Sequence, residues 1–222
     1  NFNKYIDVNQ KGLLNLLSVL SNLGDKPLVV FPSTRLVYKG KKNIALTEES
    51  EKEFKTVYGI SKFTGEHYLK MFNNLYDIPY LAVRICVPYG NLFKDQYSYG
   101  TIGFLINQAL SIRRITIYGD GLQKRTFTHV FDIYNQIIKL VKSNISHNKI
   151  YNVSGETFSI KKIAIMIAQK FNSEIVHVPW PRDELKLESG DTIFNSNLIK
   201  KEINFKLNYS FENWLKQFDD KK

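Results

Sequence analysis

Apolar residues recur along the chain with two different periods, which together predict alternating helices and strands. Leucines at helical spacing run through residues 8–23, and a second helical pattern covers residues 54–75. Short, continuous apolar runs follow these helices at residues 28–31 and 80–87, as in strands that are buried on both faces of a parallel sheet. This order predicts an α/β fold in which the two strands are joined by a parallel crossover.

The pattern is less regular beyond Gly90, where we expect a loop and then a substrate-binding region. Helical spacing and short apolar runs predict helices at residues 102–111, 132–142 and 160–171 and strands at residues 114–119, 149–153 and 174–178. Two short helices are expected near Asn197 and Phe211. The strand at residues 149–153 is expected to return to the first sheet.

Composition narrows the class of protein. The 222 residues are 43% hydrophobic, enough for a sizeable core, and no apolar run approaches the roughly 20 residues of a membrane span. The net charge of +10 comes from scattered lysines without a recognition motif, so we expect no nucleic-acid partner. The single cysteine, Cys86, cannot form an internal disulfide, which favours a reducing cytoplasm.

The strongest chemical signal is the Tyr-x-x-x-Lys motif formed by Tyr58 and Lys62. On a helix these two side chains lie on one face, one turn apart. A tyrosine that acts as a base near neutral pH must titrate below its ordinary pKa of about 10. A positive charge at roughly 5 Å contributes about 3 kcal/mol at an effective dielectric constant of about 20, which lowers the pKa by about two units.

Ser33 and Thr34 stand at the end of the first predicted strand, some 24 residues before Tyr58. A parallel sheet presents such a strand end at its carboxyl edge, where ligands bind. We therefore expect the hydroxyl of Thr34 to face the same cleft as Tyr58 and to hydrogen-bond the reacting oxygen.

Four segments, FPSTRLVY, YGISK, RICVPYG and IYGDGLQKRTFTHVFD, occur in an order and spacing that resemble the extended short-chain dehydrogenase/reductase family, closest to its nucleotide-sugar epimerase and dehydratase branch. The resemblance implies a Rossmann-like, doubly wound parallel sheet with a smaller C-terminal α+β substrate-binding region. It places the remainder of the NAD-binding domain at residues 1–90 and the substrate region mainly at residues 91–222, with residues 126–155 returning to the sheet.

The same resemblance assigns roles to single residues. Tyr58 would be the base, Lys62 the contact to the cofactor ribose and Thr34 the hydroxyl partner, while Asn9 and the backbone at Cys86 would line the cofactor site. The thiol of Cys86 itself is expected to be a core group. In the substrate region, Arg125 would grip the nucleotide diphosphate, and Thr116 and Tyr118 would border the base. His129 and Asp132 are expected to bond the local backbone, and no residue is assigned to a metal.

Departures from the family pattern limit the reaction. Arg35 and Leu36 stand where the 4,6-dehydratases carry an acidic pair, so dehydration loses support, as does decarboxylation, which uses a glutamate in that vicinity. Val87 replaces an asparagine that contacts substrate in relatives. The glycine-rich phosphate loop does not occur, and we expect about 80 to 100 residues upstream of Asn1. Residues 1–222 alone should bind NAD poorly.

The resemblance therefore favours an NAD-dependent epimerase of a nucleotide-diphosphate sugar, acting at C4 through a keto-sugar, with NADP not excluded as the cofactor. A homodimer is expected, with the helix at residues 54–75 contributing to the contact. Two alternatives stay open. One is an NAD(P)H-dependent reductase of a keto-sugar nucleotide, which uses the same three residues, and the other is a non-catalytic binding protein that kept the fold.

Overall fold

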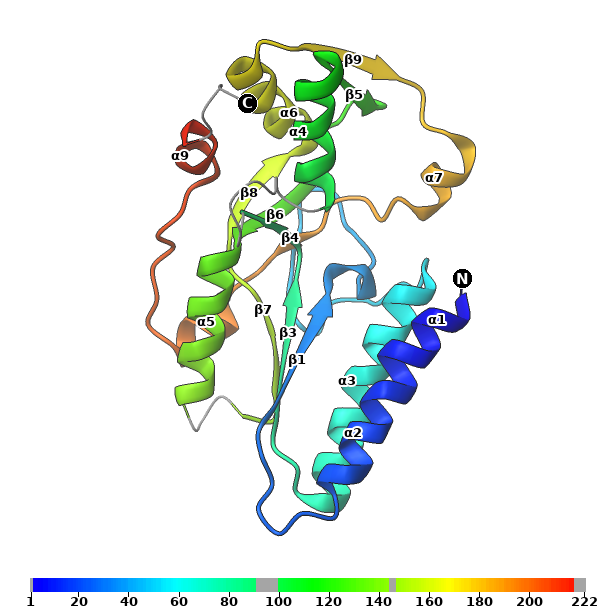
Figure 1. The fold of residues 1–222 in the computed structure, drawn as a ribbon, viewed down its shortest axis with the longest axis vertical. Helices are drawn as coiled ribbons and strands as arrows, with labels where there is room; N and C mark the ends of the chain where they lie inside the picture. Colours follow the sequence, from blue (N-terminus) through cyan, green and yellow to red (C-terminus); the bar gives the residue numbers. More distant parts are fainter. Residues whose placement is uncertain (1, 91–99, 144–146, 218–222) are drawn as a thin grey trace.

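A three-stranded parallel sheet forms the centre of the computed structural model, which describes residues 2–90, 100–143 and 147–217 (Figure 1). Its strand order is β1 (Val29–Thr34), β3 (Tyr80–Ile85) and β7 (Lys149–Asn152). Both pairs are parallel, with Val29 opposite Tyr80 and Ala82 opposite Ile150. The predicted parallel pairing of the first two strands is therefore confirmed, and β7 pairs with β3 as expected.

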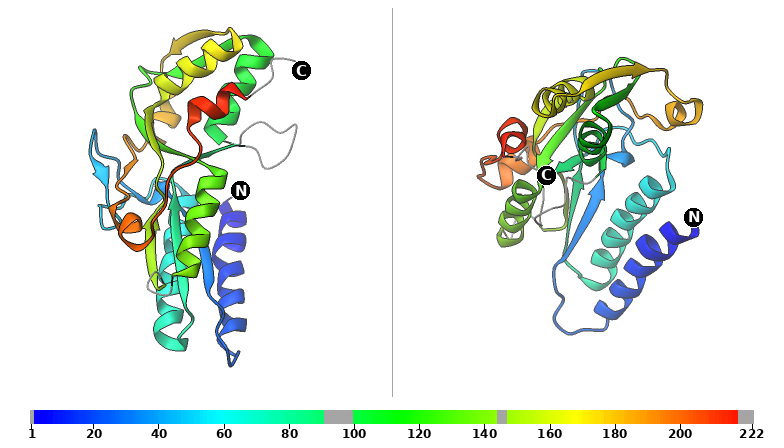
Figure 2. Two further views of the ribbon diagram at one scale, coloured as in Figure 1. Left: turned by 90° about the vertical axis from the view of Figure 1, so that its left-hand side faces the viewer. Right: turned by 45° about the horizontal axis from the view of Figure 1, so that its top comes forward.

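Helices cover this sheet on both sides (Figures 1 and 2). On one side lie α1 (Phe2–Ile6), the π-helical segment η1 (Asp7–Lys11), α2 (Gly12–Leu20) and α3 (Val57–Tyr76). Leu17 and Leu69 from these helices pack with Phe31 of β1. On the other side α5 (Val130–Lys142) packs Ile133 and Leu140 against Leu81 and Val83 of β3. The doubly wound α/β arrangement expected from the sequence is confirmed.

The expectation that the first strand is buried on both faces is wrong. In β1, Val30 is 38% exposed and Pro32 is also exposed, whereas Phe31 is buried. The reason lies in the packing of the helices, since α2 and α3 cover the Phe31 face while α5 covers β3 and β7 on the other face. The apolar character of β1 did not reveal that the helix on the α5 side of the sheet leaves β1 uncovered.

The predicted strand at residues 80–87 is divided at Cys86. β3 ends at Ile85, and β4 (Val87–Tyr89) leaves the first sheet to pair with β6 (Lys124–His129), which pairs in turn with β8 (Glu156–Ser159). Cys86 thus stands where the chain passes between two sheets, at the carboxyl edge of the first. Open α/β sheets bind their ligands outside the carboxyl ends of the strands, which is where Cys86 lies.

Most of the remaining elements form the outer region at the top of Figure 1, and the others lie lower, beside the first sheet. They are β2 (Ala45–Leu46), β10 (Ile193–Phe194), α4 (Gly100–Ile112), β5 (Arg114–Tyr118), α6 (Ile160–Phe171), β9 (Glu174–Val178), α7 (Arg182–Leu187), α8 (Asn197–Glu202), α9 (Phe211–Lys216) and the 3₁₀ turn η2 (Arg35–Val37). The loop expected directly after Gly90 lies outside the described residues. Among the helices that the structure describes, none has the length and apolar character to cross a membrane.

Candidate active site

Tyr58 and Lys62 lie in the first turns of α3. Thr56 starts the helix, because its side chain accepts a hydrogen bond from the backbone N–H of Gly59 at 3.0 Å. The ammonium Nζ of Lys62 is 5.9 Å from the centre of the Tyr58 ring and 4.8 Å from that of Phe31. Burial lowers the pKa of Lys62. The helix therefore holds a half-buried cation beside the phenol, in the arrangement that the motif predicted.

The start of α3 packs directly on the turn that follows Thr34. A Cβ atom added at Gly59 would lie 2.5 Å from the carbonyl oxygen of Leu36, closer than any side chain tolerates. Leu36 in turn donates its N–H to the hydroxyl of Thr34 at 3.3 Å. The close approach at Gly59 thus packs the first turn of α3, which carries Tyr58, on the turn that begins at the buried Thr34.

Asn9 lies in η1, which contacts α3 along the helix that carries the motif. Its neighbour Gln10 donates from Nε2 to the buried Ser61 at 3.2 Å, and Tyr5 meets Tyr58 edge to face with ring centres 6.0 Å apart. A π-helical segment inside an α-helix commonly marks a functional position. The structure therefore places Asn9 beside the motif helix, and its contact with a cofactor stays a prediction.

Cys86 is buried, and its thiol donates to the carbonyl of Thr192 at 3.3 Å. Burial raises the pKa of the thiol, which keeps it neutral near pH 7. These contacts suit the core role that the sequence favoured for the side chain, at the end of the strand next to β1.

Arg125 is only 3% exposed, and its guanidinium already donates several hydrogen bonds within the protein. It donates to the carboxylate of Glu188 and to the carbonyl of Gly190, and at 2.9 Å to the carbonyl of Lys124. A role in binding a diphosphate stays a prediction, and it requires this arginine to share its donors with a ligand.

Thr116 and Tyr118 lie on β5, which pairs with β9 and packs on α4 and α6 in the outer region. Thr116 donates its N–H to Gln108 at 3.0 Å. Tyr118 is partly exposed beside Trp180, with ring centres 5.3 Å apart. The structure thus keeps these two residues in a different region from α3 (Figure 1), and their contact with a nucleotide base stays a prediction.

The expected bond to the local backbone is present for His129, whereas the same expectation for Asp132 is wrong. His129 Nδ1 accepts from the N–H of Phe131 at 3.3 Å, within its own turn. Asp132 instead accepts from the N–H groups of Asn208 and Tyr209, at 3.0 and 3.1 Å, so its backbone partners are distant in sequence.

Sequence reasoning missed a buried polar network that fixes α3. Glu66 and Arg84 form an ion pair of 2.6 Å, with the residues 1% and 2% exposed. Ser33 donates to Glu66 at 2.5 Å, and Arg84 donates to the hydroxyl of Tyr38 at 2.7 Å. Burial disfavours the guanidinium charge of Arg84, but the hydrogen bonds that Arg84 donates to Glu66 and Tyr38, together with the charges of these partners, more than offset this and raise the pKa of Arg84. Burial also raises the pKa of Tyr38 to about 12.

This network has a direct consequence for the site. Tyr58, Lys62 and Glu66 follow one another at intervals of four residues, so they occupy the same side of α3. Glu66 ties that side to β1 and β3 through Ser33 and Arg84. A signal was present in the sequence, because Arg84 interrupts the apolar run YLAVRICV and a buried charge requires a partner.

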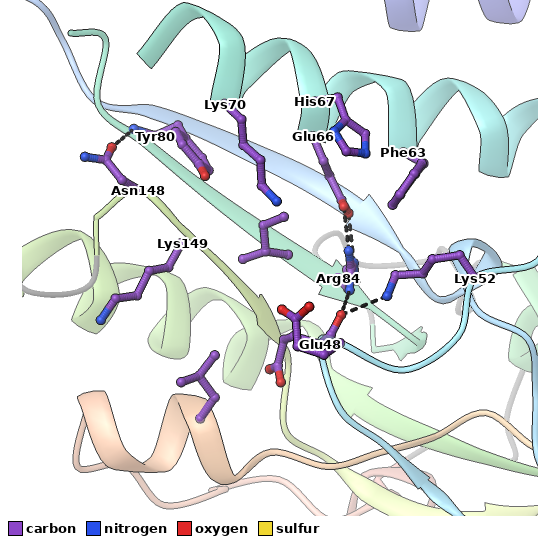
Figure 3. Close-up of a pocket in the computed structure, with 13 residues that line it drawn as sticks. Glu48, Lys52, Phe63, Glu66, His67, Lys70, Tyr80, Arg84, Asn148 and Lys149 are labelled. Atoms are coloured by element: carbon purple, nitrogen blue, oxygen red, sulfur yellow. Dashed lines mark hydrogen bonds and ion pairs between the residues drawn. The ribbon is translucent and has the colours of Figure 1, made fainter. Parts of the chain in front are cut away.

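A cavity of about 420 Å³ opens beside the same network, between α3 and the loop that carries Glu48 and Lys52 (Figure 3). Arg84 donates to the carbonyl of Glu48 at 2.8 Å, and Lys52 donates to that carbonyl at 2.9 Å. Tyr58, Lys62 and Thr34 do not belong to its lining. The cavity is therefore separate from the candidate catalytic residues.

Comparison with known proteins gives this arrangement a context. The model of the NAD dependent epimerase/dehydratase family matches residues 1–154. A putative UDP-glucose 4-epimerase of Methanocaldococcus jannaschii is 28% identical over 178 residues, which cover 77% of this chain and 56% of that protein. A UDP-N-acetyl-alpha-D-glucosaminuronate decarboxylase of Bacillus cytotoxicus is 30% identical over 226 residues, covering 96% of this chain and 68% of that protein.

Among solved structures, a UDP-glucuronic acid 4-epimerase from Bacillus cereus, in complex with UDP-glucuronic acid and NAD, superimposes with a TM-score of 0.82 at 21% identity. The match covers 95% of this chain and 66% of that one. At this identity the likeness shows the fold alone. The chain spans 56% of the Methanocaldococcus jannaschii relative, so it corresponds to little more than half of that protein's length.

Proposed function

This chain belongs to the NAD-dependent epimerase/dehydratase family, and from that premise we propose that the full-length protein is an NAD-dependent epimerase of a nucleotide-diphosphate sugar, acting at C4 through a keto-sugar. One observation carries the proposal. Lys62 is held one turn from Tyr58 on α3, and Gly59 packs the start of that helix on the turn after Thr34. This unit supplies a base, a cation and a hydroxyl group, which are the parts that epimerisation needs.

The described residues fit the ribose end of the cofactor. Lys62 is a half-buried ammonium that lies over the rings of Phe31 and Tyr58, and its N–H donors suit the hydroxyl groups of a ribose. NAD, when bound, supplies the acceptor and donor of hydride at the sugar carbon. A binding measurement with NAD and with NADP tests the preference for NAD.

In the proposed reaction Tyr58 removes the proton of the C4 hydroxyl, and Thr34 hydrogen-bonds the same oxygen. The charge of Lys62 stabilises the phenolate form of Tyr58 through space. Tyr58 later returns the proton, after the keto-sugar has presented its other face. Arg125 belongs to the proposal as a contact to the diphosphate, and Thr116 and Tyr118 as neighbours of the base. The division into a cofactor domain at residues 1–90 and a substrate region beyond it is part of the same proposal.

The proposal includes a homodimer formed through α2 and α3. Both helices carry exposed apolar side chains, among them Leu16 and Val19 on α2 and Met71 and Leu75 on α3. Two such helices from each subunit would bury these side chains in an isologous contact. Light scattering of the full-length protein tests the homodimer, and a monomer at micromolar concentration would contradict it.

The proposal also includes a cytoplasmic location, because Cys86 is a free thiol and a reducing compartment suits it.

The reaction is tested by incubating the full-length protein with UDP-sugars and NAD and following the configuration at C4 by NMR. The proposal predicts interconversion of C4 epimers without net consumption of cofactor. Consumption of added NADPH by a keto-sugar nucleotide would identify a reductase instead. No turnover of any common nucleotide sugar, with binding retained, would favour a binding protein that kept the fold.

A further inference from the structure

Arg35 and Arg125 both attach to one short segment of the chain. Arg35 donates from Nη1 to the hydroxyl of Ser189 at 3.1 Å. Arg125 binds the residues on either side, through the carboxylate of Glu188 and the carbonyl of Gly190. Two guanidinium groups therefore converge on residues 188–190, one from η2 and one from β6.

The charges in this place do not balance. Glu188 forms its ion pair with Arg125, whereas Arg35 donates its side-chain hydrogen bond to the neutral hydroxyl of Ser189. The nearby thiol of Cys86 supplies no negative charge, because burial raises its pKa. Burial and the charge of Arg125 lower the pKa of Arg35, and the charge of Glu188 offsets only part of this effect, so the cation of Arg35 is held at a cost in free energy. An anionic group that bound there would relieve that cost.

The place of Arg35 indicates which anion fits. It directly follows Thr34, whose hydroxyl is proposed to face the C4 oxygen of the sugar. In a hexuronic acid the carboxylate is attached to C5, the carbon next to C4. A planar guanidinium matches a carboxylate with two parallel hydrogen bonds, a geometry that an ammonium does not reproduce.

We propose that Arg35, positioned by Ser189, is a specificity residue that binds the carboxylate of the sugar, so that the substrate is a nucleotide-linked uronic acid in place of a neutral hexose. This inference rests on the proposed function. The diphosphate is the competing source of negative charge, and the test separates it from the sugar carboxylate.

The test is calorimetric titration of the full-length protein, in the presence of NAD, with UDP-glucuronate, UDP-glucose and UDP, repeated with the thymidine diphosphate series. The variants are Arg35→Ala and Arg35→Lys, with Arg113→Ala as a matched control at an exposed arginine that bonds the carbonyl of Phe171. Circular dichroism and thermal melting establish that each variant folds.

The wild-type protein is expected to bind the uronic acid more tightly than the neutral sugar. Arg35→Ala should weaken uronate binding roughly 10- to 100-fold while changing affinity for UDP and UDP-glucose little, as expected for loss of a hydrogen bond between charged groups. Arg35→Lys should recover part of the loss, because it keeps the charge without the fork, and Arg113→Ala should match the wild type.

Equal weakening of all three ligands by Arg35→Ala would make Arg35 a diphosphate contact and overturn the proposal. A wild-type protein that binds and epimerises UDP-glucose without preferring the uronate would also overturn it, while leaving the proposed function intact. Failure to bind any of the ligands would defeat both.

Discussion

Gly59 and the carbonyl group of Leu36 lie so close that a single added carbon would collide, at 2.5 Å, with the carbonyl oxygen. Gly59→Ala must therefore push the start of α3 away from the turn after Thr34. We expect this substitution to reduce stability by about 1–3 kcal/mol, as overpacking usually does. Activity should fall more steeply, by about 100-fold, because misplacing a reacting group by an ångström has that effect.

Urea unfolding and steady-state kinetics check this prediction. Gly24→Ala is the matched control, since a Cβ atom at Gly24 would meet nothing within 4 Å. Equal behaviour of the two alanine variants would show that the contact at Gly59 does not position the helix.

Loss of the buried carboxylate of Glu66 should lower the free energy of unfolding far more than loss of an exposed carboxylate. Glu66→Gln leaves the guanidinium of Arg84 without its counter-charge in the interior, which typically costs about 3–5 kcal/mol. Glu212→Gln removes the same charge from an exposed pair with Lys216, and there we expect little change. Both are read from the midpoint of urea unfolding, and similar midpoints would contradict the assigned importance of the buried pair.

His129 predicts a loss of stability on acidification. Burial lowers its pKa, and its ring stacks on Tyr209 with ring centres 4.2 Å apart. The unfolded chain therefore binds a proton more readily than the folded one, so stability is complete above the ordinary histidine pKa of about 6.5 and declines as the pH falls below it. Urea unfolding at pH 7.5 and pH 5.5 measures this decline.

Replacing the buried ring should remove part of that pH dependence. His129→Asn keeps an acceptor for the N–H of Phe131, and His67→Asn serves as the control because His67 is exposed. The decline between the two pH values should be smaller in His129→Asn than in the control. An unchanged decline would mean that other groups cause it.

The sequence predicted the elements whose packing leaves a periodic trace. Helix α3 and helix α6 repeat every three to four residues, and their spans agree closely with the expected ones. Strand β6 left no such trace although it is buried, because Thr126, Thr128 and His129 are polar. The partners of the two threonines are remote in sequence, since Thr128 donates to the carbonyl of Ser154 at 3.1 Å and Thr126 accepts from the N–H of Phe194, so a local pattern cannot predict the strand.

The candidate site divides in the same way. Tyr58 and Lys62 are four residues apart on one helix, and helical geometry alone brings them together. Arg35 and Ser189 are separated by 154 positions, and neither residue type indicates the other. This contact depends on the segment that follows Ser189 running beside β6, where Thr192 pairs with Arg125.

The most direct test of the account is the turnover rate of Tyr58→Phe in the full-length protein, with the C4 epimerisation assay as the readout. Removing the phenolic hydroxyl should reduce kcat by about 100- to 10,000-fold, the usual contribution of a general base, while calorimetry shows that the nucleotide sugar still binds. Tyr134→Phe, at an exposed tyrosine on α5, should keep the wild-type rate. A Tyr58→Phe enzyme that turns over within a few-fold of the wild type would contradict the central claim that Tyr58 is the base.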